Sequence, residues 1–201
     1  MHSRLRLHAV AVVVLGICLS CGAKAPPTHY YVLDLPAPAP ASARLQHTAV
    51  LVPLRVTRVI GQGRIVYRES PEQVGFYEYH RWAEDPEDGV TRLLLQELMA
   101  RGTFSSVVPF DGRTRADFIL RGELRRLEEV DYGGPVRAAV EISLELVDAG
   151  TGRVTWSGAS AVTEEVAASE VRSVVSRMGV AAGKSVRELS GQLDRHLRTK
   201  G

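Results

Sequence analysis

The second half of the chain changes from a two-residue to a helical periodicity, and this change limits the folds that the sequence can adopt. Apolar and polar residues alternate over 139–147, so one face of this segment is apolar and the other polar. The apolar face carries Val140, Ile142, Leu144 and Leu146. A glycine-containing turn at 148–152 leads into a second strand at 153–162. The pattern predicts an antiparallel hairpin with one solvated side.

A long helix is predicted after this hairpin, beginning near Ser169. Its apolar residues recur at intervals of three and four and form one stripe. The stripe comprises Val171, Val174, Val175, Met178, Ala182, Val186, Leu189, Leu193 and Leu197. Such a stripe most often packs against a sheet. The alternative is an exposed patch that docks a partner or a second copy of the chain as a homo-oligomer.

The first half of the chain predicts further strands and one helix. Alternation, β-branched and aromatic residues and flanking turns indicate strands at 30–35, 49–59, 64–68, 74–79, 107–108 and 116–130. The strand at 49–59 is expected to present Val50, Val52, Leu54 and Val56 on one face. A helix is expected from Asp85-Pro86, where acidic residues complement the helix dipole, to a stop at Gly102.

Together these elements predict an α/β fold of the α+β kind. A mainly antiparallel or mixed β-sheet would pack against one mid-chain helix and one long C-terminal helix. A chain of 201 residues is long enough for one domain of ordinary size and an export segment. We place this single domain at residues 30–199.

The first 20 residues have the pattern of a secretory signal peptide. Arg4 and Arg6 form a basic start, and a short apolar run follows over 9–17. A membrane-spanning helix would need about 20 apolar residues, so we expect removal of residues 1–20 and not a transmembrane anchor. Residues 21–29, which include two adjacent prolines, are then an extended tether.

Cys18 and Cys21 are the two cysteines of the chain, and they end the apolar run. Their C-x-x-C spacing would fit a redox or zinc site only beside further ligands, which the neighbouring sequence lacks. The segment 17–22 instead resembles the bacterial lipobox, in which a small residue precedes the acylated cysteine. This resemblance implies lipidation at Cys21, with acyl chains as a membrane anchor. Modification of Cys18, or an ordinary signal peptide with an incidental cysteine, are the alternatives.

The charge balance gives no support for nucleic-acid binding. The chain has 25 Lys and Arg against 23 Asp and Glu, and the signal segment carries two of the arginines. The remaining chain is therefore neutral, with 23 residues of each sign. We expect no nucleic-acid partner, because binding to phosphates depends on an excess of basic residues.

The sequence contains no motif that would carry catalysis or bind a cofactor. The four histidines after the signal segment have no metal-ligand spacing, and no G-x-S-x-G motif occurs. Gly61 and Gly63 lie between two predicted strands, which indicates a turn and not a phosphate-binding loop. The acidic residues at 128–131 and 164–165 are interpreted as solvated strand ends. We therefore expect no catalytic residue, no metal, no cofactor and no enzymatic activity.

Arg81, Trp82 and Trp156 are the candidates for a structural or partner-binding role. Arg81 and Trp82 stand at the end of a predicted hairpin, just before the first helix. A tryptophan has a large apolar body and one hydrogen-bond donor, which suits a core position or an interface pocket. Both roles stay open for the two tryptophans.

Several segments together resemble the ABC-type transport auxiliary lipoproteins, the family that includes the lipoprotein of the paraquat-inducible Pqi system. These segments are Tyr30-Tyr31-Val32-Leu33, Arg64-Ile65-Val66-Tyr67-Arg68, Tyr77 to Glu84, Leu94 to Leu98, Gly102-Thr103-Phe104 and Val154 to Gly158. The resemblance covers nearly all of the chain that follows the tether.

This resemblance implies an accessory component of an envelope transporter. In such systems a permease, an ATPase and a substrate-binding MCE-family protein move lipids between inner and outer membranes, and the lipoprotein supplies no ATP chemistry. The resemblance implies docking to these partners in the periplasm, with the lipid anchor in the outer membrane, and Gly22 is compatible with that sorting. A structural or assembly lipoprotein of the outer membrane is the main alternative. A periplasmic hydrolase is the enzymatic one.

Overall fold

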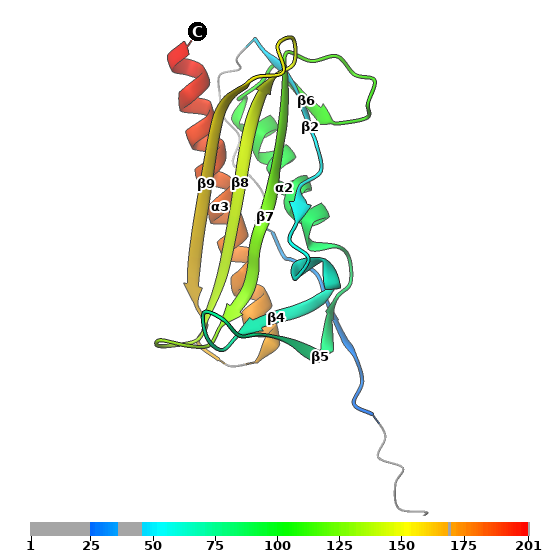
Figure 1. Ribbon diagram of the computed structural model, residues 1–201, viewed down its shortest axis with the longest axis vertical. Helices are drawn as coiled ribbons and strands as arrows, with labels where there is room; N and C mark the ends of the chain where they lie inside the picture. Colours follow the sequence, from blue (N-terminus) through cyan, green and yellow to red (C-terminus); the bar gives the residue numbers. More distant parts are fainter. Residues whose placement is uncertain (1–24, 36–45, 169, 201) are drawn as a thin grey trace, which may run out of the picture.

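The computed structural model describes residues 25–35, 46–168 and 170–200, which form one mixed sheet with two α-helices (Figure 1). The strands are β1 (His29–Tyr31), β2 (Thr48–Leu51), β3 (Arg55–Val56), β4 (Arg64–Arg68), β5 (Val74–Trp82), β6 (Ser106–Pro109), β7 (Phe118–Val130), β8 (Arg137–Asp148) and β9 (Val154–Glu165). The helices are α2 (Pro86–Arg101), α3 (Val171–Lys200) and the short 3-10 helix η1 (Ile60–Gln62). The predicted α+β fold class is confirmed.

The longest strand, β7, organises the sheet. Along one edge it pairs with β8 in antiparallel register from Phe118 to Val130, and β8 pairs in turn with β9. Along its other edge β7 pairs in parallel with three short strands, first β2, then β3 and then β4. The sheet continues with β6 beside β2, and with β5 and β1 beside β4. Segments that are far apart in the sequence therefore meet along one strand.

Helix α3 covers one face of the sheet, where it packs on β8 and β9, while α2 packs on α3 and β6 (Figure 1). All nine residues of the predicted C-terminal stripe are buried, and none is more than 8% exposed. The stripe is therefore part of the core. The alternative, an exposed docking patch on this helix, is wrong.

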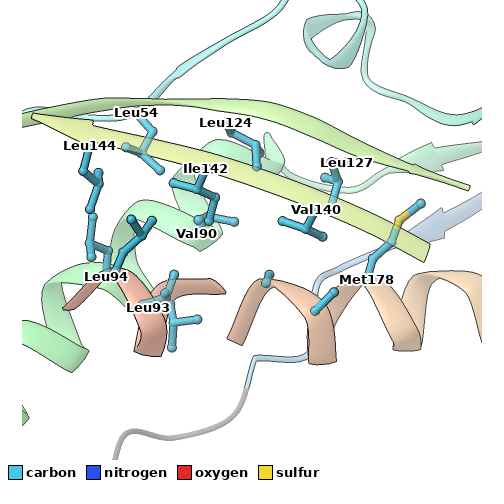
Figure 2. Close-up of a cluster of buried hydrophobic side chains, with 14 of the residues drawn as sticks. Leu54, Val90, Leu93, Leu94, Leu124, Leu127, Val140, Ile142, Leu144 and Met178 are labelled. Atoms are coloured by element: carbon cyan, nitrogen blue, oxygen red, sulfur yellow. The ribbon is translucent and has the colours of Figure 1, made fainter. Parts of the chain in front are cut away.

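A single apolar core lies between the two helices and the sheet. Figure 2 shows side chains of α2 and α3, among them Leu94 and Met178, facing Val140, Ile142 and Leu144 of β8. The four residues predicted to face inward from β8 are at most 1% exposed. The two-residue alternation thus identified the buried face of this strand correctly.

Helix α2 begins and ends where the sequence predicts. Asp85 precedes the helix, Pro86 lies in the first turn, and two acidic residues follow it. Gly102 ends the helix with a φ of 68°, a left-handed conformation that favours glycine. Its backbone N–H donates hydrogen bonds to the carbonyl oxygens of Leu98 and Met99.

The predicted strand at 49–59 is wrong in its extent and partly wrong in its facing. The structure has two short strands here, β2 and β3, and η1 follows them. Leu51 belongs to the core cluster, whereas Val50 is buried outside that cluster. Pro53 has no N–H for a sheet ladder, so the strand is interrupted there and Leu54 returns to the core.

The strand predicted at 30–35 is also shorter than expected, because β1 begins at His29 and ends at Tyr31. The chain that follows crosses the helices. A Cβ atom added to Gly179 would lie 2.4 Å from the carbonyl oxygen of Asp34, and one added to Gly89 would lie 3.7 Å from Leu35. Gly179 therefore allows this segment to lie directly against α3.

Candidate functional site

A groove of about 850 Å³ lies on the face of the sheet opposite the helices. It runs over the outer surface of β7, β8 and β9 and is bordered by the segment between β2 and β3. Its charged lining residues are Arg55, Arg121, Glu123, Arg125 and Glu145, and its small ones include Ser143, Ser157 and Ala159. The small side chains on neighbouring strands leave a space unfilled, and the longer charged side chains surround that space.

Four of the five charged side chains of this groove form ion pairs with one another. Arg121 lies 2.8 Å from Glu145, with 55% and 44% of the two side chains exposed. Arg125 lies 3.5 Å from Glu123. Arg55 forms no ion pair within the part of the chain that the structure describes. Exposed pairs contribute at most about 1 kcal/mol, so these side chains are able to exchange partners with a bound molecule.

A second group of charges is buried between β4 and β7. Glu128 is 3% exposed and accepts hydrogen bonds from Arg68 at 2.8 and 3.0 Å, and from Arg126 at 2.6 Å. Burial is the largest single influence on the pKa of Glu128 and would raise it. The hydrogen bonds and the positive charges of the two arginines together outweigh burial, so the pKa lies below its ordinary value.

The neighbouring Glu129 is 4% exposed and accepts a hydrogen bond of 2.8 Å from the Tyr77 hydroxyl. Burial raises the pKa of Glu129, and burial together with this carboxylate raises the pKa of Tyr77. The interpretation of 128–129 as a solvated strand end is therefore wrong. A bulge between Leu124 and Arg126 shifts the register of β7, and β4 covers the end of the strand. Neither carboxylate lines the groove, and both join β7 to its neighbours.

Two histidines that are far apart in the sequence meet at the β1–β5 pair. The rings of His29 and His80 stack with centroids 5.2 Å apart, and the Tyr31 hydroxyl lies 2.8 Å from Nδ1 of His80. Burial, followed by the charge of His29, lowers the pKa of His80. Among the residues that the structure describes, no group of three His, Cys, Asp or Glu is arranged to hold a metal.

The residues singled out in the sequence do not meet at one site. Trp82 is 7% exposed and belongs to the core. Trp156 is partly buried over Gly158, with its ring centroid 6.4 Å from that of His196 on α3. Arg81 lies on β5, and none of these side chains lines the groove.

The predicted lipidation site, Cys21, lies outside the described residues. Over the described ranges, neither helix combines the length and the apolar character needed to cross a membrane.

The fold defines this chain as an α+β domain with an open, charged groove on the outer face of its sheet. The chain belongs to the family of ABC-type transport auxiliary lipoprotein components, whose sequence pattern matches residues 31–190. This is a family of lipid-anchored, envelope-associated proteins that are auxiliary to ABC transporters, so the resemblance seen in the sequence is confirmed. No protein with a curated description matches the sequence significantly.

Solved structures share the fold at low sequence identity. A Xanthomonas campestris protein of family DUF330 is 20% identical with a TM-score of 0.76, over 86% of this chain and 98% of that one. An uncharacterised protein is 13% identical with a TM-score of 0.62, over 86% and 99% of the two chains. A hypothetical protein of Chlamydia trachomatis is 10% identical with a TM-score of 0.52, over 76% and 98%. At these identities the likeness is one of fold.

Proposed function

We propose that this protein is a non-catalytic periplasmic accessory of an MCE-type ABC transporter. It would take part in lipid movement between inner and outer membranes by docking partner proteins. The family assignment supports the association with a transporter. The groove on the open face of the sheet supports the docking role, because its charged side chains are exposed and only weakly paired.

The groove suits a protein partner that carries acidic side chains. Arg55 has no carboxylate partner among the described residues. Arg121 is paired with Glu145, but both side chains of this pair are exposed to solvent. Charge complementarity of this kind speeds association and fixes the orientation of a complex. We expect an acidic segment of the MCE-family protein to lie over these two arginines.

The lipid anchor would hold the domain close to a membrane. In this proposal Cys21 is the acylated N-terminus, and residues 22–28, which precede β1, form the tether; it spans about 22 Å at ~3.1 Å per residue. Several acyl chains make the attachment effectively permanent, because one chain alone binds only marginally. Gly22 after the cysteine fits sorting to the outer membrane.

Purification of the tagged full-length lipoprotein from cross-linked envelopes tests the proposal. The MCE-family protein, the permease and the ATPase are expected to be recovered with it. Arg55→Glu combined with Arg121→Glu should lower recovery of the MCE protein at least about tenfold, since each charge reversal replaces attraction by repulsion. Arg153→Glu is the matched control, because Arg153 is an exposed arginine that does not line the groove.

Two outcomes would contradict the proposal. Recovery of an outer-membrane assembly complex without transporter components would favour a structural or assembly lipoprotein of the outer membrane. Turnover of ester substrates by the purified protein would contradict the proposal that the protein is not an enzyme.

A further inference from the structure

Three side chains on neighbouring strands form a row at one end of the sheet. Arg64 of β4 lies directly opposite Arg81 of β5, and Arg81 lies directly opposite Tyr30 of β1. Side chains at directly paired positions of adjacent strands extend from the same face of a sheet and lie about 5 Å apart at their Cβ atoms. The two guanidinium groups and the phenol therefore share one surface.

The two arginines have no internal counter-charge. Neither Arg64 nor Arg81 forms an ion pair or a side-chain hydrogen bond with any described residue, in contrast to Arg68 on the same strand as Arg64. Glu84, which follows β5, is paired with Arg92 at 2.9 Å. Like charges at directly opposite positions destabilise a sheet, so this pair is better satisfied by an anion from outside the chain.

Exposed apolar side chains lie at Tyr30, which is paired with Arg81, and two residues further along the chain. Tyr30 is 65% exposed and Val32 is 56% exposed, the two highest values among the large hydrophobic side chains of the described residues. A tyrosine with an apolar ring and a polar tip favours the interface between lipid and water. We call the group formed by Tyr30, Val32, Arg64 and Arg81 the tyrosine–arginine surface.

The position of this surface in the chain indicates what covers it. Tyr30 follows Cys21 by nine residues, which span at most about 28 Å at ~3.1 Å per residue. Figure 1 shows β4 and β5 at the end of the molecule toward which the described residues 25–28 extend. An acyl anchor at Cys21 would therefore hold this end, and not the end that carries β6, at the bilayer.

We propose that the tyrosine–arginine surface docks on the bilayer, with Arg64 and Arg81 on the phosphates of anionic phospholipids and Tyr30 and Val32 at the interface. The contact rests on the proposed anchoring at Cys21, and it fixes how the anchored domain is oriented. Arginine is suited to this contact because its planar guanidinium donates two hydrogen bonds to a phosphate. The acyl anchor then attaches the domain to the membrane, and the tyrosine–arginine surface fixes the orientation of the domain on it.

Site-specific fluorescence on the full-length acylated protein tests this orientation. The chain after Cys21 contains no other cysteine, so Val32→Cys accepts a single environment-sensitive probe. Val154→Cys is the matched control, because Val154 is 48% exposed and β9 begins at the opposite end of the molecule (Figure 1). Both proteins are reconstituted in phosphatidylcholine vesicles with and without phosphatidylglycerol, and quenching by spin-labelled lipids is measured by time-resolved emission.

We expect quenching at Val32→Cys and not at Val154→Cys, and a dependence on phosphatidylglycerol. In the Arg64→Gln/Arg81→Gln double variant the ratio of docked to undocked probe should fall about 30-fold, which corresponds to about 1 kcal/mol for each arginine. Arg64→Lys/Arg81→Lys should retain most of the docking, and this variant distinguishes loss of charge from loss of structure.

Four results would overturn the proposal. Equal quenching at the two probe positions would show that the domain has no preferred orientation. Unchanged quenching in the glutamine double variant with an intact circular dichroism spectrum would remove the arginines from the contact. If the protein does not float with the vesicles, the anchoring itself fails and the docking fails with it, whereas flotation without quenching overturns the docking alone.

Discussion

At the scale of single residues, Gly179 allows the N-terminal segment to lie on α3. A Cβ atom at this position would lie 2.4 Å from the carbonyl oxygen of Asp34 and would collide with it. We expect Gly179→Ala to destabilise the fold by about 1–3 kcal/mol, measured by urea unfolding, since residues 32–35 have to move. Gly191→Ala is the control on the same helix. Its added Cβ would lie 3.5 Å from Arg195, so it should stabilise by up to about 1 kcal/mol through helix propensity. Equal effects of the two changes would contradict the close contact.

Glu128 gives a pH-dependent prediction at the same scale. Its pKa in the folded protein is lower than the ordinary value of 4.5, so the charged carboxylate stabilises the fold. This contribution is fully present above the unfolded pKa and is lost as the pH falls through the lower folded pKa. Glu128→Gln should therefore cost about 1–3 kcal/mol at pH 7, because the buried position then holds a neutral group and the partly exposed Arg68 and Arg126 lose their carboxylate partner.

Urea unfolding between pH 3 and pH 8 measures this effect. The difference in stability between the natural protein and Glu128→Gln should shrink as the pH falls below about 4.5. A difference that stays constant over this range would show that the ion pairs of Glu128 do not stabilise the fold.

At the scale of elements, α3 depends on the sheet that it covers. An amphipathic helix in a folded protein is stabilised mainly by tertiary burial of its apolar face. Leu189 is 0% exposed, so Leu189→Ala should cost about 2–5 kcal/mol in urea unfolding through lost burial and a cavity. The exposed Arg195 on the same helix is the control, and Arg195→Ala should stay within about 0.5 kcal/mol of the natural protein. A small cost at Leu189 would mean that α3 is not held in this packing.

The elements that the sequence predicted best are those with local patterns. The β8–β9 hairpin, α2 and α3 all occur where periodicity and end signals indicated. The predicted strand at 49–59 failed, because β2 lies between β6 and β7 and its residues 49–51 are buried on both faces. A strand covered on both faces has no clean alternation to identify its inner side.

At the scale of the whole molecule, the proposed anchor at Cys21 precedes Tyr30 of the tyrosine–arginine surface by only nine residues in the chain. Cys21→Ser should release the domain from membranes and leave it folded, as fractionation and circular dichroism would show. The physical reason is that acyl chains, and not protein contacts, would supply the attachment. Cys18→Ser is the control and should stay in the membrane fraction. Retention of Cys21→Ser, or loss of Cys18→Ser, would contradict lipidation at Cys21.

Sequence patterns could not predict the groove. The groove takes Arg55 from β3, Arg121 from β7 and Glu145 from β8, and no local motif joins these residues. The pairing of β1 with β5 brings together positions about 50 residues apart, which is why the contact of His29 with His80 was missed.

The sequence by itself determined the family, the fold class, the β8–β9 hairpin and the two long helices, because these depend on short-range periodicity and on recognisable segments. Only the tertiary structure decided that β7 pairs with four other strands, that a bulge after Leu124 helps to bury Glu128, and that Arg64 faces Arg81. Register and strand order depend on which distant segments bury surface together, and the local sequence of each segment does not determine this pairing.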